Sequence, residues 1–295
     1  MKKNLFLFVS AASVSMLILL SCSSTPPPSS IETKEQPASS AQEGKKARTI
    51  TLLIPRLMKE TVLFPDGAED EYTLYTYSPK GTLLKEELYD ASSRQLLEYS
   101  EYLYENVALA EKRTYDGNQK VKNRKTYRYE KSLLVEESLY DKADDVQIRS
   151  LNIYDSQNRK IEWRTLDASG SVIGINRYGY GSGTTPERIE LLGPGENLEL
   201  TITVSYANGR KEKERFELPN GRIEKEIVYT YDDKGRLTSE TTYSDTKIKI
   251  SSTLFEYPVD KNEPTRAIYR DAQDKPKKIV QYEYEYHEEK RVVYE

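Results

Sequence analysis

Large aromatic residues return at a nearly constant interval along most of this chain. Nine positions, each 25 to 27 residues after the last, hold tyrosine, and another large side chain stands two residues before most of them. Residues i and i+2 share one face of a β-strand, so this spacing predicts a strand in each unit. The nine positions, called the anchor tyrosines below, are Tyr77, Tyr104, Tyr129, Tyr154, Tyr180, Tyr206, Tyr231, Tyr257 and Tyr284.

A second large residue follows each anchor tyrosine after 10 to 12 residues, and turn-forming segments separate these positions. Examples are 116–118 (Asp-Gly-Asn), 207–209 (Ala-Asn-Gly) and 232–235 (Asp-Asp-Lys-Gly), which favour tight turns. Each unit is therefore predicted to be a β-hairpin. The pattern predicts an all-β fold, a repetitive antiparallel hairpin meander of about nine units that forms a long, twisted or coiled sheet. Residues 49–64 are expected to add a strand or two as a cap.

The unit around residues 227–243 alternates between two faces. Strict alternation places Tyr229, Tyr231, Leu237 and Tyr243 together on an inner face. Other strands, such as 109–115, carry charged residues on the same face as a tyrosine. Because a lipid-facing lysine or arginine costs about 2–4 kcal/mol near the midplane, these strands argue against an outer-membrane barrel. They favour a sheet that is wet on one side.

The N-terminus has the pattern of an export signal. Residues 1–21 hold two lysines and then an apolar run, Leu5 to Leu20, that is short for a membrane span. The run ends in Leu19-Leu20-Ser21-Cys22, which resembles the lipobox of bacterial lipoproteins. The resemblance implies cleavage before Cys22, a diacylglycerol on its thiol and a further acyl chain, such as palmitate, on its amine. The alternative is an ordinary secretory signal with an incidental cysteine.

Residues 22–48 are predicted to be the lipidated Cys22 and a disordered tether, and residues 49–295 the folded repeat domain. The tether holds six serines, four prolines and one large aliphatic residue, Ile31, too little apolar surface to offset the entropy of ordering. Ser23 and Ser24 stand where inner-membrane lipoproteins of the enterobacterial type carry an aspartate. That difference favours the outer membrane over the inner one and leaves the leaflet open.

Composition limits the core and the partners. Hydrophobic residues are 37% with 24 tyrosines counted, and charged residues are 31%, so the core must be thin and most of the surface wet. There are 44 Lys plus Arg against 48 Asp plus Glu, a formal net charge of −4. An acidic exported domain is a poor nucleic-acid or anionic-lipid binder, and no nucleic-acid partner is expected.

One unit resembles a known repeat. Tyr229-Thr230-Tyr231-Asp232-Asp233-Lys234-Gly235-Arg236-Leu237 is similar to the YD repeat of the RHS class of bacterial exported proteins, and residues 154–159 match it in part. The resemblance implies a continuous curling β-sheet, in that class sometimes a closed shell around a toxin. No toxin-like segment follows the repeats in this sequence, so the shell-and-cargo role is not carried over. The repeat-motif residues are Tyr229, Tyr231, Asp232, Gly235, Arg236 and Leu237.

Candidate chemistry is sparse. The only histidine, His287, is expected at the surface in the last turn, so neither a catalytic triad nor a zinc site is expected. The glycines of 179–183 precede no helix, and this segment is interpreted as a loop rather than a phosphate site. Paired carboxylates such as Asp155, Asp232 and Asp271 leave one catalytic route open, although turn residues are the simpler interpretation. We expect no cofactor and no metal.

The tyrosine rows and the lone Trp163 have two interpretations. Aromatic rows can stack on sugars, but core and cross-strand packing is the simpler explanation. Two functional hypotheses follow. The first is a lipid-anchored, non-catalytic envelope scaffold that presents a β-repeat surface to a protein or glycan. The alternative is a carboxylate-dependent envelope glycan hydrolase.

Overall fold

The computed structural model describes residues 47–294. The predicted signal peptide, Cys22 and nearly all of the predicted tether lie outside the described residues. Residues 50–291 form one compact unit, and the barrel described below is that unit.

The chain forms 18 strands in one sheet. Their bounds are β1 (Ala47–Leu63), β2 (Glu69–Tyr77), β3 (Leu83–Asp90), β4 (Leu96–Glu105), β5 (Ala108–Asp116), β6 (Val121–Glu130), β7 (Leu133–Asp141), β8 (Val146–Tyr154), β9 (Lys160–Asp167), β10 (Val172–Tyr180), β11 (Pro186–Leu192), β12 (Leu198–Ala207), β13 (Arg210–Glu217), β14 (Ile223–Tyr231), β15 (Leu237–Ser244), β16 (Lys249–Glu256), β17 (Arg266–Asp271) and β18 (Pro276–Tyr294). A short 3-10 helix, η3 (Pro194–Glu196), is the helical element in the described range. No helix among residues 47–294 is long and apolar enough to cross a membrane.

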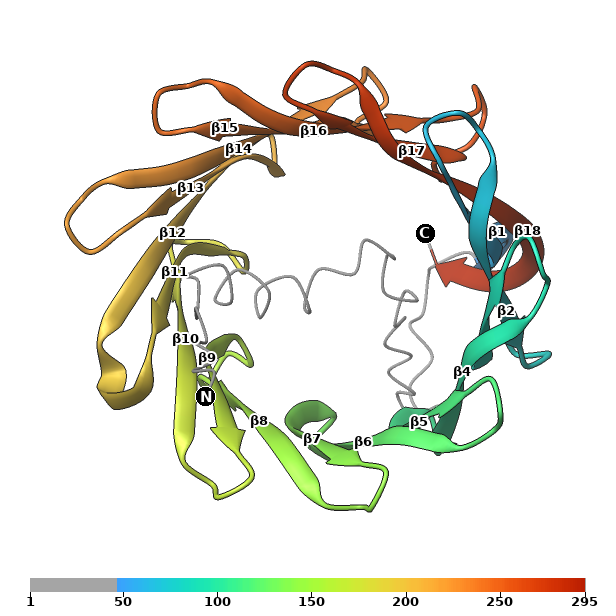
Figure 1. The fold of residues 1–295 in the computed structure, drawn as a ribbon, viewed down its shortest axis with the longest axis horizontal. Helices are drawn as coiled ribbons and strands as arrows, with labels where there is room; N and C mark the ends of the chain where they lie inside the picture. Colours follow the sequence, from blue (N-terminus) through green and yellow to red (C-terminus); the bar gives the residue numbers. More distant parts are fainter. Residues whose placement is uncertain (1–46, 295) are drawn as a thin grey trace, which may run out of the picture. The chain divides into compact units, whose positions relative to one another are not determined.

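The sheet closes on itself. Each strand pairs with the next along the chain in the antiparallel sense, from β2 with β3 to β17 with β18. β1 pairs with both β2 and β18, which completes the ring in Figure 1. The predicted all-β antiparallel meander is confirmed, and the coiled sheet is a closed barrel. Closure removes the free edges that a long open sheet would expose along its length.

Most strands are joined by a turn of one kind. At Asp232–Arg236 the amide of Asp232 donates to the carbonyl of Arg236 at 3.0 Å, and the amide of Gly235 donates to the carbonyl of Asp232 at 2.8 Å. Gly235 has a φ of 78°. The segment is one of the predicted tight turns, and it is a type I turn followed by a left-handed residue. The left-handed position is occupied by Asn158 in another unit, at 62°.

A β-bulge follows nearly every turn and changes which way later side chains face. Tyr231 pairs with Leu237, but Thr230 pairs with Ser239, so Thr238 is an extra residue. The extra residue reverses the alternation in β15, and Tyr243 pairs with Glu226, on the face opposite Tyr231. The prediction that Tyr243 shares the inner face is therefore wrong, because strict alternation does not count the bulge.

The ends of the repeat also differ from expectation. The last anchor tyrosine, Tyr284, and the second large residue of its unit, Tyr294, both lie in the single long strand β18, so the ninth unit is not a hairpin. His287 lies in that strand and not in a turn. Residues 47–63 form one strand, which brings the total to 18 with the cap included.

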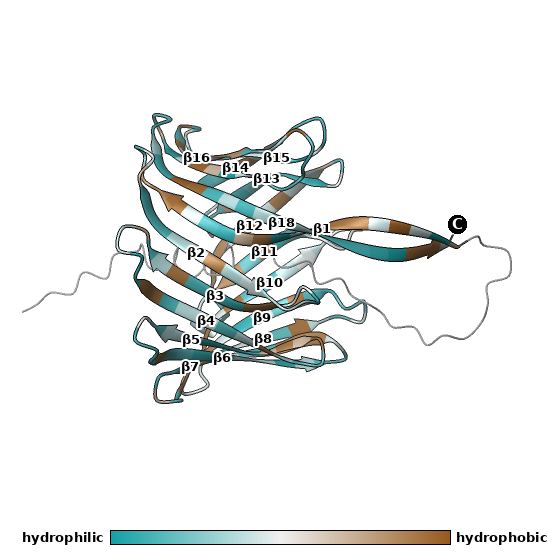
Figure 2. Ribbon diagram, turned by 90° about the vertical axis from the view of Figure 1, so that its right-hand side faces the viewer, coloured by the Kyte–Doolittle hydropathy of each residue, from teal (hydrophilic) through white to brown (hydrophobic). Residues whose placement is uncertain are grey.

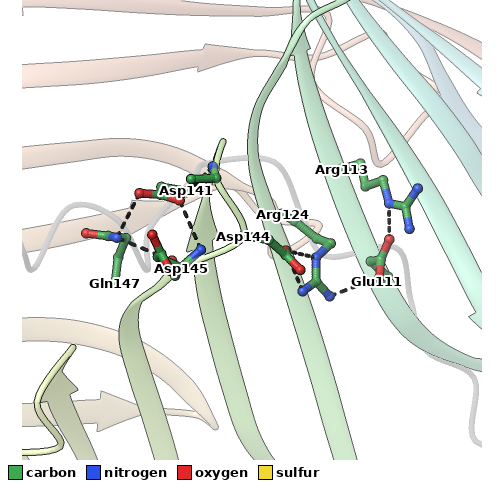
Figure 3. A network of polar contacts seen from close by, with 8 residues as sticks. Glu111, Arg113, Arg124, Asp141, Asp144, Asp145 and Gln147 are labelled. Carbon is green, nitrogen blue, oxygen red and sulfur yellow. Dashed lines mark hydrogen bonds and ion pairs between the residues drawn. The ribbon is translucent and has the colours of Figure 1, made fainter.

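The two faces of the wall can be assigned from one network. In Figure 3, Glu111, Arg113 and Arg124 stand on the near side of their strands with the opposite wall behind them, so they face outward. Glu111 pairs with Leu103, and the flanking Tyr102 and Tyr104 therefore face inward. The tyrosines at the anchor position and two residues before it line the inside of the barrel.

Candidate functional site

A ring of side chains on the inner wall is the strongest candidate site. Each member of the ring is the cross-strand partner of the residue that stands two positions before an anchor tyrosine. For example, Glu86 pairs with Tyr75, and Lys112 pairs with Tyr102. Because the unit length is constant, these partners come to similar heights around the lumen. The inner ring consists of Glu86, Lys112, Glu137, Trp163, Ile189, Glu214 and Glu240, with Ala267 at the last position.

Much of the charge in this ring is paired within the wall. Lys112 contacts Glu86 at 3.2 Å across one unit. Glu214 accepts the ammonium of Lys211 at 2.6 Å and the hydroxyl of Tyr229 at 2.8 Å. These contacts use carboxylates and hydroxyls that an inner-wall ligand would otherwise meet.

Besides the tyrosines, three ionisable side chains of the inner wall have a pKa shifted by burial. Burial raises the pKa of Glu60, Lys278 opposes the rise, and Glu71 and Glu86 add to it. Burial also raises the pKa of Glu240, against the charge of Lys211. Burial lowers the pKa of the Lys160 ammonium. Shifts of this kind occur at functional sites and also in structural charge networks.

The anchor tyrosines form a ladder of side-chain to main-chain hydrogen bonds. Tyr231 donates its hydroxyl to the carbonyl of Lys211 at 2.7 Å, and Tyr257 donates to that of Leu237 at 2.8 Å. In each described case the acceptor lies 20 residues earlier. In every pair except Tyr77–Leu57, the acceptor stands next to the bulge that starts the second strand of the preceding unit. The other pairs are Tyr77–Leu57, Tyr154–Leu134, Tyr180–Lys160 and Tyr206–Pro186. The ladder gives these carbonyls a partner beside an irregular point in the strand pairing.

Cations lie over many of the inner tyrosine rings. The guanidinium of Arg236 lies 4.7 Å from the ring centre of Tyr257, and the ammonium of Lys211 lies 5.2 Å from that of Tyr229. A ring face covered in this way is not open for stacking on a sugar. The contacts favour the packing interpretation of the tyrosine rows over the sugar-platform one.

The repeat-motif residues join adjacent units. Asp232 accepts the amides of Lys234 and Arg236 at 3.0 and 2.9 Å and the Arg236 Nε at 2.7 Å. Arg236 also donates to the carbonyls of Pro258 and Lys261 in the next unit at 2.8 and 2.6 Å. The Arg236 amide, followed by its side chain, holds the pKa of Asp232 below its usual value. The motif therefore fixes the turn and ties it to the following loop.

The other predicted site residues are not brought together. Asp155 repeats the contacts of Asp232, binding Arg159 Nε at 2.8 Å. Asp271 caps a turn after an odd-numbered strand, at the opposite end of the barrel from the turns of Asp155 and Asp232. Trp163 lies on the inner wall opposite Asn152. His287 lies 3.4 Å from Glu285. In the part of the chain that the structure describes, no three His, Cys, Asp or Glu side chains are placed to hold a metal ion.

The outer wall carries its own charge network. Arg124 binds Asp144 at 2.7 Å and Glu111 at 3.4 Å, and Glu111 also binds Arg113 (Figure 3). Asp141 closes the neighbouring turn by accepting the amides of Ala143 and Asp145 at 2.8 and 3.0 Å. These contacts could be expected in part from the sequence, because alternation along residues 109–115 puts Glu111 and Arg113 on the same strand face as Tyr115.

No protein-family model matches the sequence, and no curated protein matches it. Among solved structures, the chain is similar to a porin-like protein from Bacteroides uniformis ATCC 8492, with 11% identity, a TM-score of 0.43 and coverage of 78% of this chain and 96% of that one. A porin-like protein from Bacteroides vulgatus ATCC 8482 gives 11% identity, a TM-score of 0.36 and coverage of 78% and 98%. The structure described as TcdB2-TccC3-TEV gives 10% identity, a TM-score of 0.24 and coverage of 72% and 16%. Likenesses of this size carry no inference about function.

Proposed function

We propose that the protein is a non-catalytic scaffold of the bacterial envelope, anchored by lipid on Cys22, in the outer membrane rather than the inner one. The barrel presents its wall to a protein or glycan partner. The observation that carries the proposal is how the repeated side chains are used. Tyrosine hydroxyls bind main-chain carbonyls, and turn aspartates bind main-chain amides and arginines, so the motif builds the wall. The side chains that vary between units are then displayed on a rigid surface.

Detergent partition of whole cells tests the anchor. Cys22 is the only cysteine in the chain and stands at the end of the lipobox-like run. We expect Cys22→Ala to move the protein out of the detergent phase, whereas Ser24→Ala, two residues along, leaves it there. Equal partition of Cys22→Ala and the parent would reject the lipid anchor.

Crosslinking in intact cells, followed by purification, tests the scaffold function. We expect one partner to be captured with the parent protein. Charge reversal of Arg128, which is exposed on the outer wall, should reduce capture if the outer wall is the binding face. Absence of any crosslinked envelope protein or glycan would count against the scaffold.

The glycan hydrolase is the second candidate, and one observation favours it. Glu60, whose pKa is raised by burial, feels the charge of Glu86 on the inner wall. A carboxyl with a raised pKa beside a second carboxyl is the arrangement that glycoside hydrolysis uses. The test is whether the protein releases soluble sugar from purified envelope glycan. Release by the parent that is lost in both Glu60→Gln and Glu86→Gln, but kept in Glu130→Gln at the rim, would favour the hydrolase over the scaffold.

A further inference from the structure

A groove opens where β1 leaves the barrel wall. The pairing of β1 with β2 ends at Lys59 and Leu74, and beyond this point β1 continues beside β18 past the rim (Figure 2). The groove lies at this fork and has a volume of about 360 Å³. Its walls include Arg56, Met58, Tyr75, Tyr77, Glu285 and His287. Because β1, β2 and β18 all contribute side chains, closure of the barrel assembles the groove.

Arg56 holds the position of the motif arginine at this fork. Its guanidinium lies 6.0 Å from the ring centre of Tyr77, 21 residues later. Arg236 lies over its own anchor tyrosine at the same sequence interval, at 4.7 Å. The Nε of Arg236 binds the carboxylate of Asp232, four residues earlier, at 2.7 Å. Leu52 stands four residues before Arg56, so the motif supplies no carboxylate here.

The charge of Arg56 is not paired by the wall. Within residues 47–294 its guanidinium forms no ion pair and donates no hydrogen bond, and its described interaction is the contact with the Tyr77 ring. Glu285 lines the same groove but contacts His287, at 3.4 Å. Arg56 is half-buried, and a guanidinium in that position gains most from a planar acceptor with two oxygens. The groove therefore presents a cation that lacks its carboxylate.

We infer that this groove binds a small organic carboxylate, which takes the place on Arg56 that Asp232 takes on Arg236. The two oxygens of the ligand match the fork of the guanidinium. Met58 and Pro79 also line the groove and give the body of the ligand an apolar contact that an inorganic anion would leave unused. The volume suits a metabolite-sized ligand, because such sites span about 300–1,000 Å³. The inference goes beyond the proposed scaffold and depends neither on the lipid anchor nor on the envelope partner.

Arg210 provides a comparison within the same chain. Its guanidinium lies 5.7 Å from the ring centre of Tyr231, and Ala207 stands where the motif has its aspartate. Arg210 is not part of the lining of the groove. Arg210→Gln therefore removes the same kind of ring contact as Arg56→Gln without changing the groove.

Calorimetric titration of the full mature chain tests the inference with three probes, N-acetylphenylalanine, its uncharged amide and inorganic phosphate. We expect the acid to bind and the amide to bind about tenfold more weakly, because the amide cannot form the charged pair with the guanidinium. Arg56→Gln should weaken binding of the acid by a similar factor, whereas Arg210→Gln should leave it unchanged. The melting temperatures of both variants show that each is folded.

Arginine labelling with phenylglyoxal, followed by peptide mass spectrometry, locates the site without a variant. The acid should protect Arg56 and leave Arg210 reactive, and the amide should protect neither. Absence of saturable binding by the acid, equal affinity of the amide, or equal losses in Arg56→Gln and Arg210→Gln would overturn the inference. Phosphate that displaces the acid with equal affinity would overturn it in favour of an inorganic oxyanion.

Discussion

The barrel sector from β2 to β9 and the closing seam of β16, β17, β18 and β1 are held together by different interactions. Every buried side chain of the sector is polar, namely Ser100, Thr114, Ser138, Asn152, Glu162 and Thr165. The seam instead buries apolar side chains in two clusters. One contains Ala267 and Val280, and the other contains Leu63, Ile268 and Ile279.

The difference follows from how the strands are connected. In the sector each strand pair is joined by a turn, so its closure is local and its contacts repeat along the chain. β18 and β1 are far apart in sequence and have no turn between them, so bringing them together costs more chain entropy. Adjacent residues Ala267 and Ile268 point to opposite faces, which places one apolar cluster on each side of the seam. Burial of apolar surface there stabilises the pairing that the repeat itself does not supply.

The largest expected effect comes from changing the number of strands. Deleting residues 206–230 removes two strands and leaves 16, so β1 and the last strand can still meet antiparallel. Deleting residues 216–228 removes one strand and leaves 17, which brings the same two edges together in the wrong direction. We expect the first chain to be soluble with a cooperative melting transition and the second to aggregate. The solubility and melting of both deletion variants are measured beside those of the parent. If the two variants behaved alike, the number of strands would not determine whether the barrel closes.

A substitution in each region measures the contrast directly. Val280 is 2% exposed in the inner cluster of the seam, and Val280→Asp buries an unpaired charge, with an expected loss of several kcal/mol. In the sector, the hydroxyls of Ser100 and Thr114 share a hydrogen bond of 3.1 Å. Thr114→Val removes that bond while keeping the shape and should cost about 1 kcal/mol. Equal losses in urea unfolding would refute the distinction between an apolar seam and a polar sector.

The turn glycine should matter more than its neighbour. Gly235 has a φ of 78°, and an added Cβ would overlap the guanidinium of Arg210. Gly235→Val should cost at least about 1–2 kcal/mol from the left-handed backbone alone. Lys234→Val, one residue earlier in the same turn, should leave the melting midpoint nearly unchanged. A comparable decrease in both variants would show that the turn conformation does not limit stability.

The smallest expected effects have opposite signs in the two regions as pH changes. Burial raises the pKa of Glu60 in the seam above its unfolded value, so ionised Glu60 destabilises the fold at neutral pH and the penalty disappears as pH falls below the unfolded pKa. Glu60→Gln should raise the melting temperature near pH 8, with the gain shrinking toward about pH 4.

Asp155 in the sector behaves in the reverse way. The Arg159 amide, followed by its side chain, lowers the pKa of Asp155. Its stabilisation is present above the unfolded pKa and is lost as pH falls through the folded value. Asp155→Asn should therefore lower the melting temperature near neutral pH and have less effect in acid. The same sign for Asp155→Asn and Glu60→Gln at neutral pH would contradict the two assignments.

The local part of this fold could be predicted from the sequence. Tyrosine spacing and turn residues such as Asp232 and Gly235 report on neighbours along the chain, and they predict the hairpins and the positions of the tight turns. The bulge at Thr238 leaves no compositional mark, so the face of Tyr243 was assigned wrongly. Pairing of β18 with β1 is a long-range contact that no repeat unit encodes.

The candidate site was predictable only in its parts. The motif residues Asp232 and Arg236 were identified, but their role in tying one unit to the next depends on carbonyls of Pro258 and Lys261 in a loop without a motif. The hydroxyl ladder had a usable signal, because each donor and its acceptor stand 20 residues apart. Finding it required knowing that a bulge lies beside the acceptor carbonyl. The inner ring required the strand register, which the bulges set.

The closure of the barrel is tested most directly by a zero-length crosslink across the seam. The ammonium of Lys59 in β1 lies 3.5 Å from the carboxylate of Glu283 in β18. Carbodiimide treatment of the native protein, followed by peptide mass spectrometry, should therefore recover an amide between these residues, and Lys59→Gln should abolish it. Lys112 and Glu86, 3.2 Å apart within the sector, provide the positive control. Recovery of the Lys112–Glu86 amide without any Lys59–Glu283 amide would show an open sheet and contradict the closed barrel.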